Sequence, residues 1–191
     1  VVFMDRMNQT NPTYPHETIE ATNPCGEQPL PAYDSCNLGS INLSRFARDP
    51  LPDSYAISAA EEGIDWERLG AAVRTGVHFL DNVIDRNRYP IEQIKEQTQK
   101  NRRIGLGVMG WADLLIRLRL PYDAPEALAL GERVMAFVES EARKHSSELA
   151  KSRGKFPNWE NSVYAADGVA MRNATVTTIA PTGTISIIAG C

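Results

Sequence analysis

The chain has 191 residues, of which 42% are hydrophobic and 23% are charged, and its net charge at pH 7 is −4. This composition is typical of a folded globular protein and excludes a disordered chain. The negative charge offers nucleic acid and anionic membranes no general attraction, and no apolar run reaches the roughly 18 residues of a membrane span. We therefore expect a cytoplasmic protein that binds neither nucleic acid nor a membrane.

The first part of the chain is dominated by turn-forming residues. Residues 8–36 are rich in Asn, Thr, Pro and Gly, and proline excludes both a helix interior and a central strand. We therefore predict a long ordered loop here, and loops of this length are commonly functional.

Helical periodicity begins at residue 64. Apolar residues spaced three or four apart predict a helix over residues 64 to about 87, and a second helix is predicted over 91–100. Further helices are expected over 113–120 and 124–153, the latter with Pro125 near its start and Gly154 as its stop. The β-branched stretch 174–180 predicts a buried strand. Helices between short strands indicate an α/β fold.

Residues 104–110 contain the spacing G-x-G-x-x-G. This spacing binds dinucleotides only when an apolar strand precedes it, and here the preceding residues are polar and basic. We therefore interpret the glycines as allowing close backbone packing of a strand or turn against a helix.

Two further regions have residues suited to ligands. Pro181 and Gly183 predict a turn after the strand, and its amides and hydroxyls could hold a phosphate, although such turns are also common without ligands. The three histidines are dispersed and there is no Cys/His cluster, so no protein metal site is predicted.

In the loop, Asn23, Cys25 and Glu27 alternate with small residues. In an extended segment alternate side chains share a face, so an amide, a thiol and a carboxylate could converge on one ligand. No neighbouring His or Lys favours the thiolate, so the thiol suits hydrogen-atom transfer better than nucleophilic attack. Cys36 lies eleven residues later and could form a disulfide with Cys25 or serve a separate step.

The loop sequence NPCGEQPLPAYDSCNLGSINL resembles the active-site loop of ribonucleotide reductase large subunits, most closely the adenosylcobalamin-dependent class II enzymes. Two later stretches, NRRIGLGVMGWADLL and APTGTISIIAGC, resemble the same family, so the likeness covers essentially the whole chain. The resemblance implies that residues 1–191 are part of a catalytic ten-stranded α/β barrel with a finger loop at about 20–36. Because neither end has the features of a natural terminus, we expect a fragment truncated at both ends.

The resemblance also implies a role for each site residue. Cys25 would be the thiyl-radical cysteine that takes the 3′-hydrogen of the substrate ribose. Glu27 would accept the proton of the 3′-hydroxyl, and Asn23, beside Gly26, would orient the ribose hydroxyls. Cys36 would be one of two redox cysteines, with its partner outside this chain. The substrate phosphates would bind the turn formed by Pro181, Thr182, Gly183, Thr184, Ile185 and Ser186.

The family's chemistry supplies the expected cofactor and partners. Adenosylcobalamin would provide the radical, with contacts mostly outside this chain. The substrate would be a ribonucleoside di- or triphosphate, and a thioredoxin-like dithiol would be the reductant. The full-length enzyme would be a homodimer, with dNTP and ATP effector sites outside the chain.

Two alternatives stay open from the sequence. The chain could belong to a class I large subunit, whose radical comes from a separate metal-containing subunit. It could also be a non-catalytic nucleotide-binding homologue, although Asn23, Cys25, Glu27 and Cys36 together favour an enzyme.

Overall fold

The computed structural model describes residues 2–48 and 57–191. Its centre is a parallel pair of strands, β3 (Asn37–Asn42) and β4 (Ile104–Met109), paired from Asn37 with Ile104 to Asn42 with Met109. Between them in the chain lie a 3-10 turn, η1 (Leu43–Phe46), and three helices, α2 (Ile57–Glu62), α3 (Trp66–Arg86) and α4 (Glu92–Asn101). This strand–helix–strand connection establishes the predicted α/β class.

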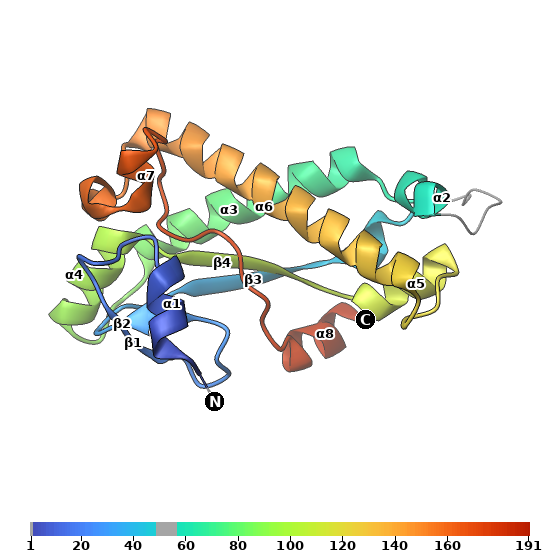
Figure 1. The fold of residues 1–191 in the computed structure, drawn as a ribbon, viewed down its shortest axis with the longest axis horizontal. Coiled ribbons are helices and arrows are strands. Elements are labelled where there is room, and N and C mark those ends of the chain that lie inside the picture. Colours follow the sequence, from blue (N-terminus) through green and yellow to red (C-terminus); the bar gives the residue numbers. More distant parts are fainter. Residues whose placement is uncertain (1, 49–56) are drawn as a thin grey trace.

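Two long helices cover the sheet. Helix α3 packs on β3 and β4, and α6 (Pro125–Arg153) packs on α3 (Figure 1). Leu69, Val73 and Val77 of α3 are fully buried at the helical spacing that predicted this helix. The side chain of Asp65 caps α3 by accepting a hydrogen bond from the Arg68 amide at 3.1 Å. The predicted helices over 64–87 and 124–153 are thus confirmed.

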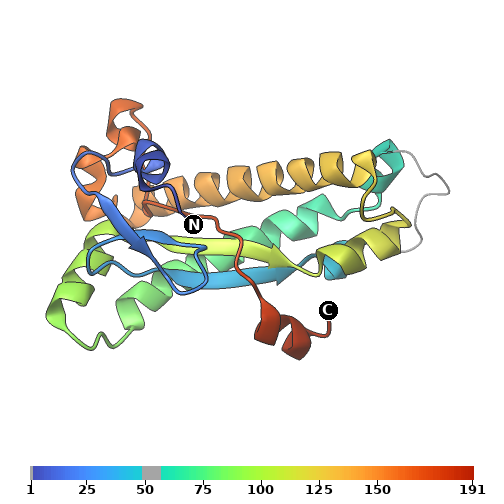
Figure 2. The ribbon, with the colours of Figure 1, turned by 60° about the horizontal axis from the view of Figure 1, so that its bottom comes forward.

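The remaining elements are short. α1 (Met4–Thr10) precedes a hairpin of β1 (Ile19–Thr22) and β2 (Pro29–Pro31), α5 (Trp111–Leu118) follows β4, and η2 (Pro157–Asn161), α7 (Val163–Ala166) and α8 (Gly183–Ala189) follow α6. Helix α8 lies on the opposite side of the sheet from α6 in both views (Figures 1 and 2). The described residues close no barrel, so they show the α/β class and not a ten-stranded count.

The predicted loop over residues 8–36 was only partly right. It contains the antiparallel β1–β2 hairpin, in which Ile19 pairs with Pro31 and Thr22 with Pro29. Proline donates no backbone hydrogen bond and is tolerated in a strand at an edge. Among the described residues β2 pairs with β1 alone, so it lies at an edge.

The predicted strand over residues 174–180 is an extended segment with a single bridge, between Leu106 of β4 and Thr177. The amides of Ile104 and Leu106, two residues apart, donate to the adjacent carbonyls of Thr175 and Val176. This uneven step interrupts a regular ladder, so the segment lies along β4 but is not the regular strand that was predicted.

Most of the G-x-G-x-x-G stretch forms strand β4, so the predicted close packing of a strand is confirmed, but the expected helix is not its partner. A Cβ atom on Gly105 would lie 2.7 Å from the Gln28 amide nitrogen and 2.8 Å from the Thr178 methyl group. A Cβ atom on Gly107 would lie 2.3 Å from the Thr178 carbonyl oxygen. The close neighbours are thus the hairpin and the 174–180 segment rather than a helix.

We expect Gly107→Ala to destabilise the protein by about 1–3 kcal/mol, because the new methyl group must displace backbone atoms at Thr178. The measurement is urea denaturation of the full-length protein. Gly131→Ala is the matched control: it lies inside α6, its Cβ would make only an ordinary 3.5 Å contact with Trp111, and helix propensity predicts a gain of roughly 0.5–1 kcal/mol. Equal effects of the two substitutions would contradict the packing interpretation.

Candidate active site on the finger loop

Cys25 lies at the tip of the β1–β2 hairpin. The amide of Gly26 donates to the carbonyl of Asn23 at 3.0 Å, which makes residues 23–26 a β-turn with Pro24 and Cys25 at its centre. Gly26 has a φ of +82°, a backbone conformation that glycine adopts most easily. The turn therefore presents the Cys25 thiol to solvent, and the extended arrangement expected for residues 23–27 was wrong.

Asn23 closes the base of this turn. Its amide donates to the Gln28 carbonyl at 3.1 Å, and its side-chain Oδ1 accepts from the Gln28 amide at 3.0 Å. The side-chain oxygen is therefore engaged in holding the tip. Within the described residues its Nδ2 group makes no hydrogen bond, so Nδ2 is the part of the amide left to orient a ligand.

Glu27 turns inward from the tip. Its Oε2 atom is buried and has no hydrogen-bond partner within the described residues. A buried carboxylate oxygen without a partner is costly, so it is a candidate acceptor for a ligand hydroxyl. The Glu27 carbonyl accepts a 2.8 Å hydrogen bond from the Thr178 hydroxyl, which ties the hairpin to the 174–180 segment.

Cys36 is the residue before β3 and is partly buried. Burial raises the pKa of its thiol well above the usual range, the nearby charges of Asp34 and Glu27 raise it further, and Arg103 lowers it. Gln28, which follows Glu27, and Leu38, two residues after Cys36, both lie against Gly105, so the two segments are adjacent. All three cysteines are free thiols, so the disulfide between Cys25 and Cys36 that the sequence left open is not formed.

The predicted phosphate turn forms the start of α8. Thr182 has a left-handed φ of +59° and is the N-cap residue, but no side chain caps the helix. The amides of Gly183, Thr184 and Ile185 are therefore the uncapped donors of its first turn. A Cβ atom on Gly183 would meet nothing within 4 Å, so the turn is open to its surroundings.

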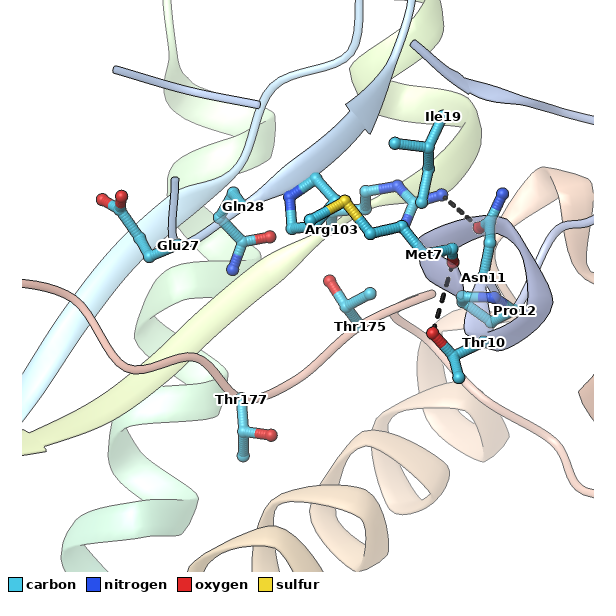
Figure 3. A pocket seen from close by; sticks show the side chains of 11 residues that line it. Met7, Thr10, Asn11, Pro12, Ile19, Glu27, Gln28, Arg103, Thr175 and Thr177 are labelled. Carbon is cyan, nitrogen blue, oxygen red and sulfur yellow. Dashed lines mark hydrogen bonds between the residues drawn. The ribbon is translucent and has the colours of Figure 1, made fainter. Parts of the chain in front are cut away.

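Part of the predicted site lines a cavity of about 180 Å³. Glu27 lies toward one end, Asn11 toward the other, and Arg103 between them (Figure 3). Asn23, Cys25, Cys36 and the 181–186 turn do not line this cavity. The structure thus groups Asn23, Cys25 and Glu27 on one turn, and the hydrogen bond from Thr178 to Glu27 connects this turn to the segment that precedes the 181–186 turn.

Sequence reasoning missed the residues that support the site. Arg103 and Asp34 form a buried ion pair with 2.8 Å between Nε and Oδ2, and Thr178 anchors the hairpin. A signal was present in the adjacent arginines of Asn101-Arg102-Arg103, directly before a strand, where charged residues need partners if they are buried.

Within the described ranges, no three Cys, His, Asp or Glu side chains are grouped so that they could hold a metal ion. Among residues 2–48 and 57–191, no helix combines the length and apolar content that a membrane span requires.

Known proteins resemble the chain along its length. It is 53% identical over 191 residues to a vitamin B12-dependent ribonucleoside-diphosphate reductase of Thermoplasma acidophilum, covering 100% of this chain and 23% of the relative. A reductase of the same name from Mycobacterium tuberculosis is 47% identical over 190 residues, covering 100% of this chain and 26% of the relative. The chain therefore spans about a quarter of the length of these relatives.

A solved structure extends the comparison to three dimensions. The class Id ribonucleotide reductase alpha subunit of Actinobacillus ureae matches with a TM-score of 0.72 and 27% identity, covering 98% of this chain and 34% of that one. A protein-family model described as the barrel domain of ribonucleotide reductase matches residues 1–171. The chain therefore belongs to the ribonucleotide reductase barrel-domain family.

Proposed function

We propose that the protein carrying this chain is a ribonucleotide reductase, an oxidoreductase that converts ribonucleotides to 2′-deoxyribonucleotides for DNA synthesis. The observation that carries the proposal is the hairpin tip, where an exposed thiol lies between the amide of Asn23 and the buried, unpartnered carboxylate oxygen of Glu27. The names of the relatives favour a ribonucleoside diphosphate as substrate over a triphosphate.

Cys25, Glu27 and Asn23 each have a separate role at the ribose. Cys25, as a thiyl radical, takes the 3′-hydrogen, which its exposed position on the tight turn allows. Glu27 accepts the proton of the 3′-hydroxyl at Oε2, the oxygen without a hydrogen-bond partner among the residues that the structure describes. Asn23 orients the hydroxyls through its Nδ2 group, while its Oδ1 atom keeps the turn closed. The 2′-hydroxyl then takes a proton from one of the two redox thiols and leaves as water, and Cys25 finally returns the hydrogen atom to C3′, which regenerates its thiyl radical.

Cys36 supplies reducing equivalents for this step. It and a second cysteine outside this chain would each give up one hydrogen and form a disulfide, which a thioredoxin-like dithiol reduces again. The meeting of Gln28 and Leu38 at Gly105 supports a place for Cys36 beside the segment that carries Glu27.

The turn from Pro181 to Ser186 would bind the substrate phosphates. The uncapped amides of Gly183, Thr184 and Ile185 offer hydrogen-bond donors, and the partial positive charge of a helix N-terminus favours an anion. The bond between Thr178 and the Glu27 carbonyl would fix the distance between the phosphate turn and the finger loop.

Adenosylcobalamin is the proposed cofactor, and the site fits it in one respect. The Cys25 thiol is exposed and has no activating base, which suits the loss of a hydrogen atom rather than a proton. When bound, the cofactor would supply the radical that this thiol receives. We assign no residue of this chain to hold it.

The complete enzyme would have features beyond this chain. We propose that β3 and β4 belong to a ten-stranded α/β barrel with the finger loop, about residues 20–36, at its centre. The enzyme would be a cytoplasmic homodimer regulated by dNTP and ATP. Identities of 47–53% to vitamin B12-dependent reductases favour this class over a class I subunit.

Glu27 offers a direct test. We expect Glu27→Gln in the full-length protein to lower kcat by about 10²–10⁴-fold, because the amide cannot accept the 3′-hydroxyl proton. Deoxyribonucleotide formation measures this loss. Glu20→Gln removes an exposed carboxylate from β1 of the same hairpin and should leave turnover unchanged. Full turnover by the Glu27 variant would overturn the role proposed for this carboxylate.

A further inference from the structure

Cys36 lies where strands β3 and β4 begin to pair. It directly precedes β3, and Arg103 directly precedes β4, which pairs in parallel with β3 from Asn37 and Ile104 onward. The register therefore places Cys36 and Arg103 beside each other at the start of the ladder.

Arg103 connects distant parts of the chain around this point. Its side chain is only 1% exposed, although arginine is rarely buried. Its Nε atom donates to Asp34 at 2.8 Å, and its guanidinium also donates to Asn11 at 3.2 Å and to Thr13 at 3.0 Å. One arginine thus joins the start of the loop region to the residue two positions before Cys36.

Asp34 and its neighbour Ser35 make further hydrogen bonds that fix the backbone before Cys36. Its side chain is fully buried and accepts a second hydrogen bond from Asn101 at 2.7 Å, while its Oδ1 atom accepts from the Ser35 amide at 2.9 Å. The Ser35 hydroxyl lies 2.7 Å from that of Thr98 on α4. The backbone leading into Cys36 is therefore fixed by partners on both of its sides.

The same residues control the charge near the sulfur. Asp34 acts from the segment that carries Cys36, Glu27 from the hairpin and Arg103 from the start of β4. Arg103 is the cation in this group. It contacts the Asp34 carboxylate directly and lies 3.9 Å from the Glu17 carboxylate.

We propose that Arg103 and Asp34 are positioning residues for Cys36: together they fix its sulfur at the start of β3 and set the balance between its thiol and thiolate forms. The meaning of this pair for catalysis rests on the redox role proposed for Cys36. The effect of the pair on the reactivity of the Cys36 thiol does not depend on that redox role. The positioning proposal and the proposed function can therefore fail separately.

The test follows alkylation of Cys36 by iodoacetamide in the reduced full-length protein, from about pH 7 to about pH 10, because only the thiolate reacts. Proteolytic cleavage after Glu27 separates Cys36 from Cys25 before mass spectrometry. Asp34→Asn removes the negative charge and should raise the rate at a fixed pH by roughly threefold or more. Arg103→Gln removes the positive charge and should lower the rate by a similar factor.

The decisive result is that the two substitutions change the alkylation rate of Cys36 in opposite directions. A purely structural role would loosen the segment in both variants and raise the rate in both, which would overturn the proposal, as would two unchanged rates. Asp85→Asn is the matched control, because it removes a carboxylate that pairs with the neighbouring Arg102 and should leave the rate unchanged.

A double variant keeps the test decisive if the single variants fail to fold. If one single variant fails to fold, the other decides by whether its alkylation rate rises or falls as expected. If neither folds, the double variant Asp34→Asn/Arg103→Gln removes both members of the buried pair, and its rate should lie between the two single-variant expectations. A double-variant rate many times above that of the native protein would mean loosening and would overturn the proposal. Opposite shifts in a protein that makes no deoxyribonucleotide would sustain the pair and reject the proposed function.

Discussion

Replacing Cys25 with serine in the full-length protein is expected to reduce deoxyribonucleotide formation by at least about 10³-fold while substrate binding persists. Serine has nearly the same size, and the turn is held by backbone atoms and Asn23, so the tip should keep its shape. The O–H bond of serine is too strong to replace S–H in hydrogen-atom transfer. Turnover and equilibrium binding of the substrate, measured side by side, check this expectation.

Cys191→Ser is the matched control for this substitution. Cys191 is also a free thiol, but it lies at the end of α8 beside Gly110, away from the hairpin, and has no assigned role. The control should retain turnover. A Cys25→Ser protein that still reduces ribose would end the thiyl assignment, and native protein that binds nucleotides without reducing them would favour a non-catalytic homologue.

The largest effect on stability is expected at Asp81, in the C-terminal part of α3. Its side chain is fully buried, and its carboxylate lies 2.8 Å from Arg102, 3.4 Å from Arg172 and 3.5 Å from Arg153. It also accepts a 3.0 Å hydrogen bond from Asn173. This one carboxylate joins α3, the segment between α4 and β4, the end of α6 and the segment that leads to the 181–186 turn.

Asp81→Asn should lower the free energy of unfolding by about 3–5 kcal/mol, because the buried Arg102 and Arg172 lose the carboxylate that they share and Arg102 keeps only the more exposed Asp85. Urea denaturation of the full-length protein measures the loss. Glu139→Gln removes one partner of an exposed pair with Arg143 on α6, and such pairs contribute no more than about 1 kcal/mol. If both substitutions cost the same, the Asp81 cluster is not the stabilising centre inferred from its burial.

The sequence predicted the elements that have a strong local pattern. The helices over 64–87 and 124–153 have apolar residues at helical spacing, and Pro125 and Gly154 mark the ends of the second. The active-site loop was predicted as a site because its residue types and their order are specific. These features depend on residues that are close together in the sequence, so they can be predicted without knowledge of the fold.

The elements that were missed depend on distant partners. β3 has the mixed sequence NLGSIN and becomes a strand because β4 pairs with it. α8 contains Ile185, Ile187 and Ile188, whose β-branched side chains favour a strand, yet it is helical after the left-handed turn at Thr182. The ion pair of Arg103 and Asp34 joins residues far apart in the chain, and no spacing predicts it.

Formation of deoxyribonucleotide by the full-length protein, given a ribonucleoside diphosphate, a dithiol and adenosylcobalamin, tests the central claim most directly. The hairpin tip, with its exposed Cys25 and inward Glu27, predicts that the 2′-deoxy product forms and that omitting adenosylcobalamin abolishes it. Substrate binding without any 2′-deoxy product, or full turnover without the cofactor, would contradict the proposed cobalamin-dependent reductase.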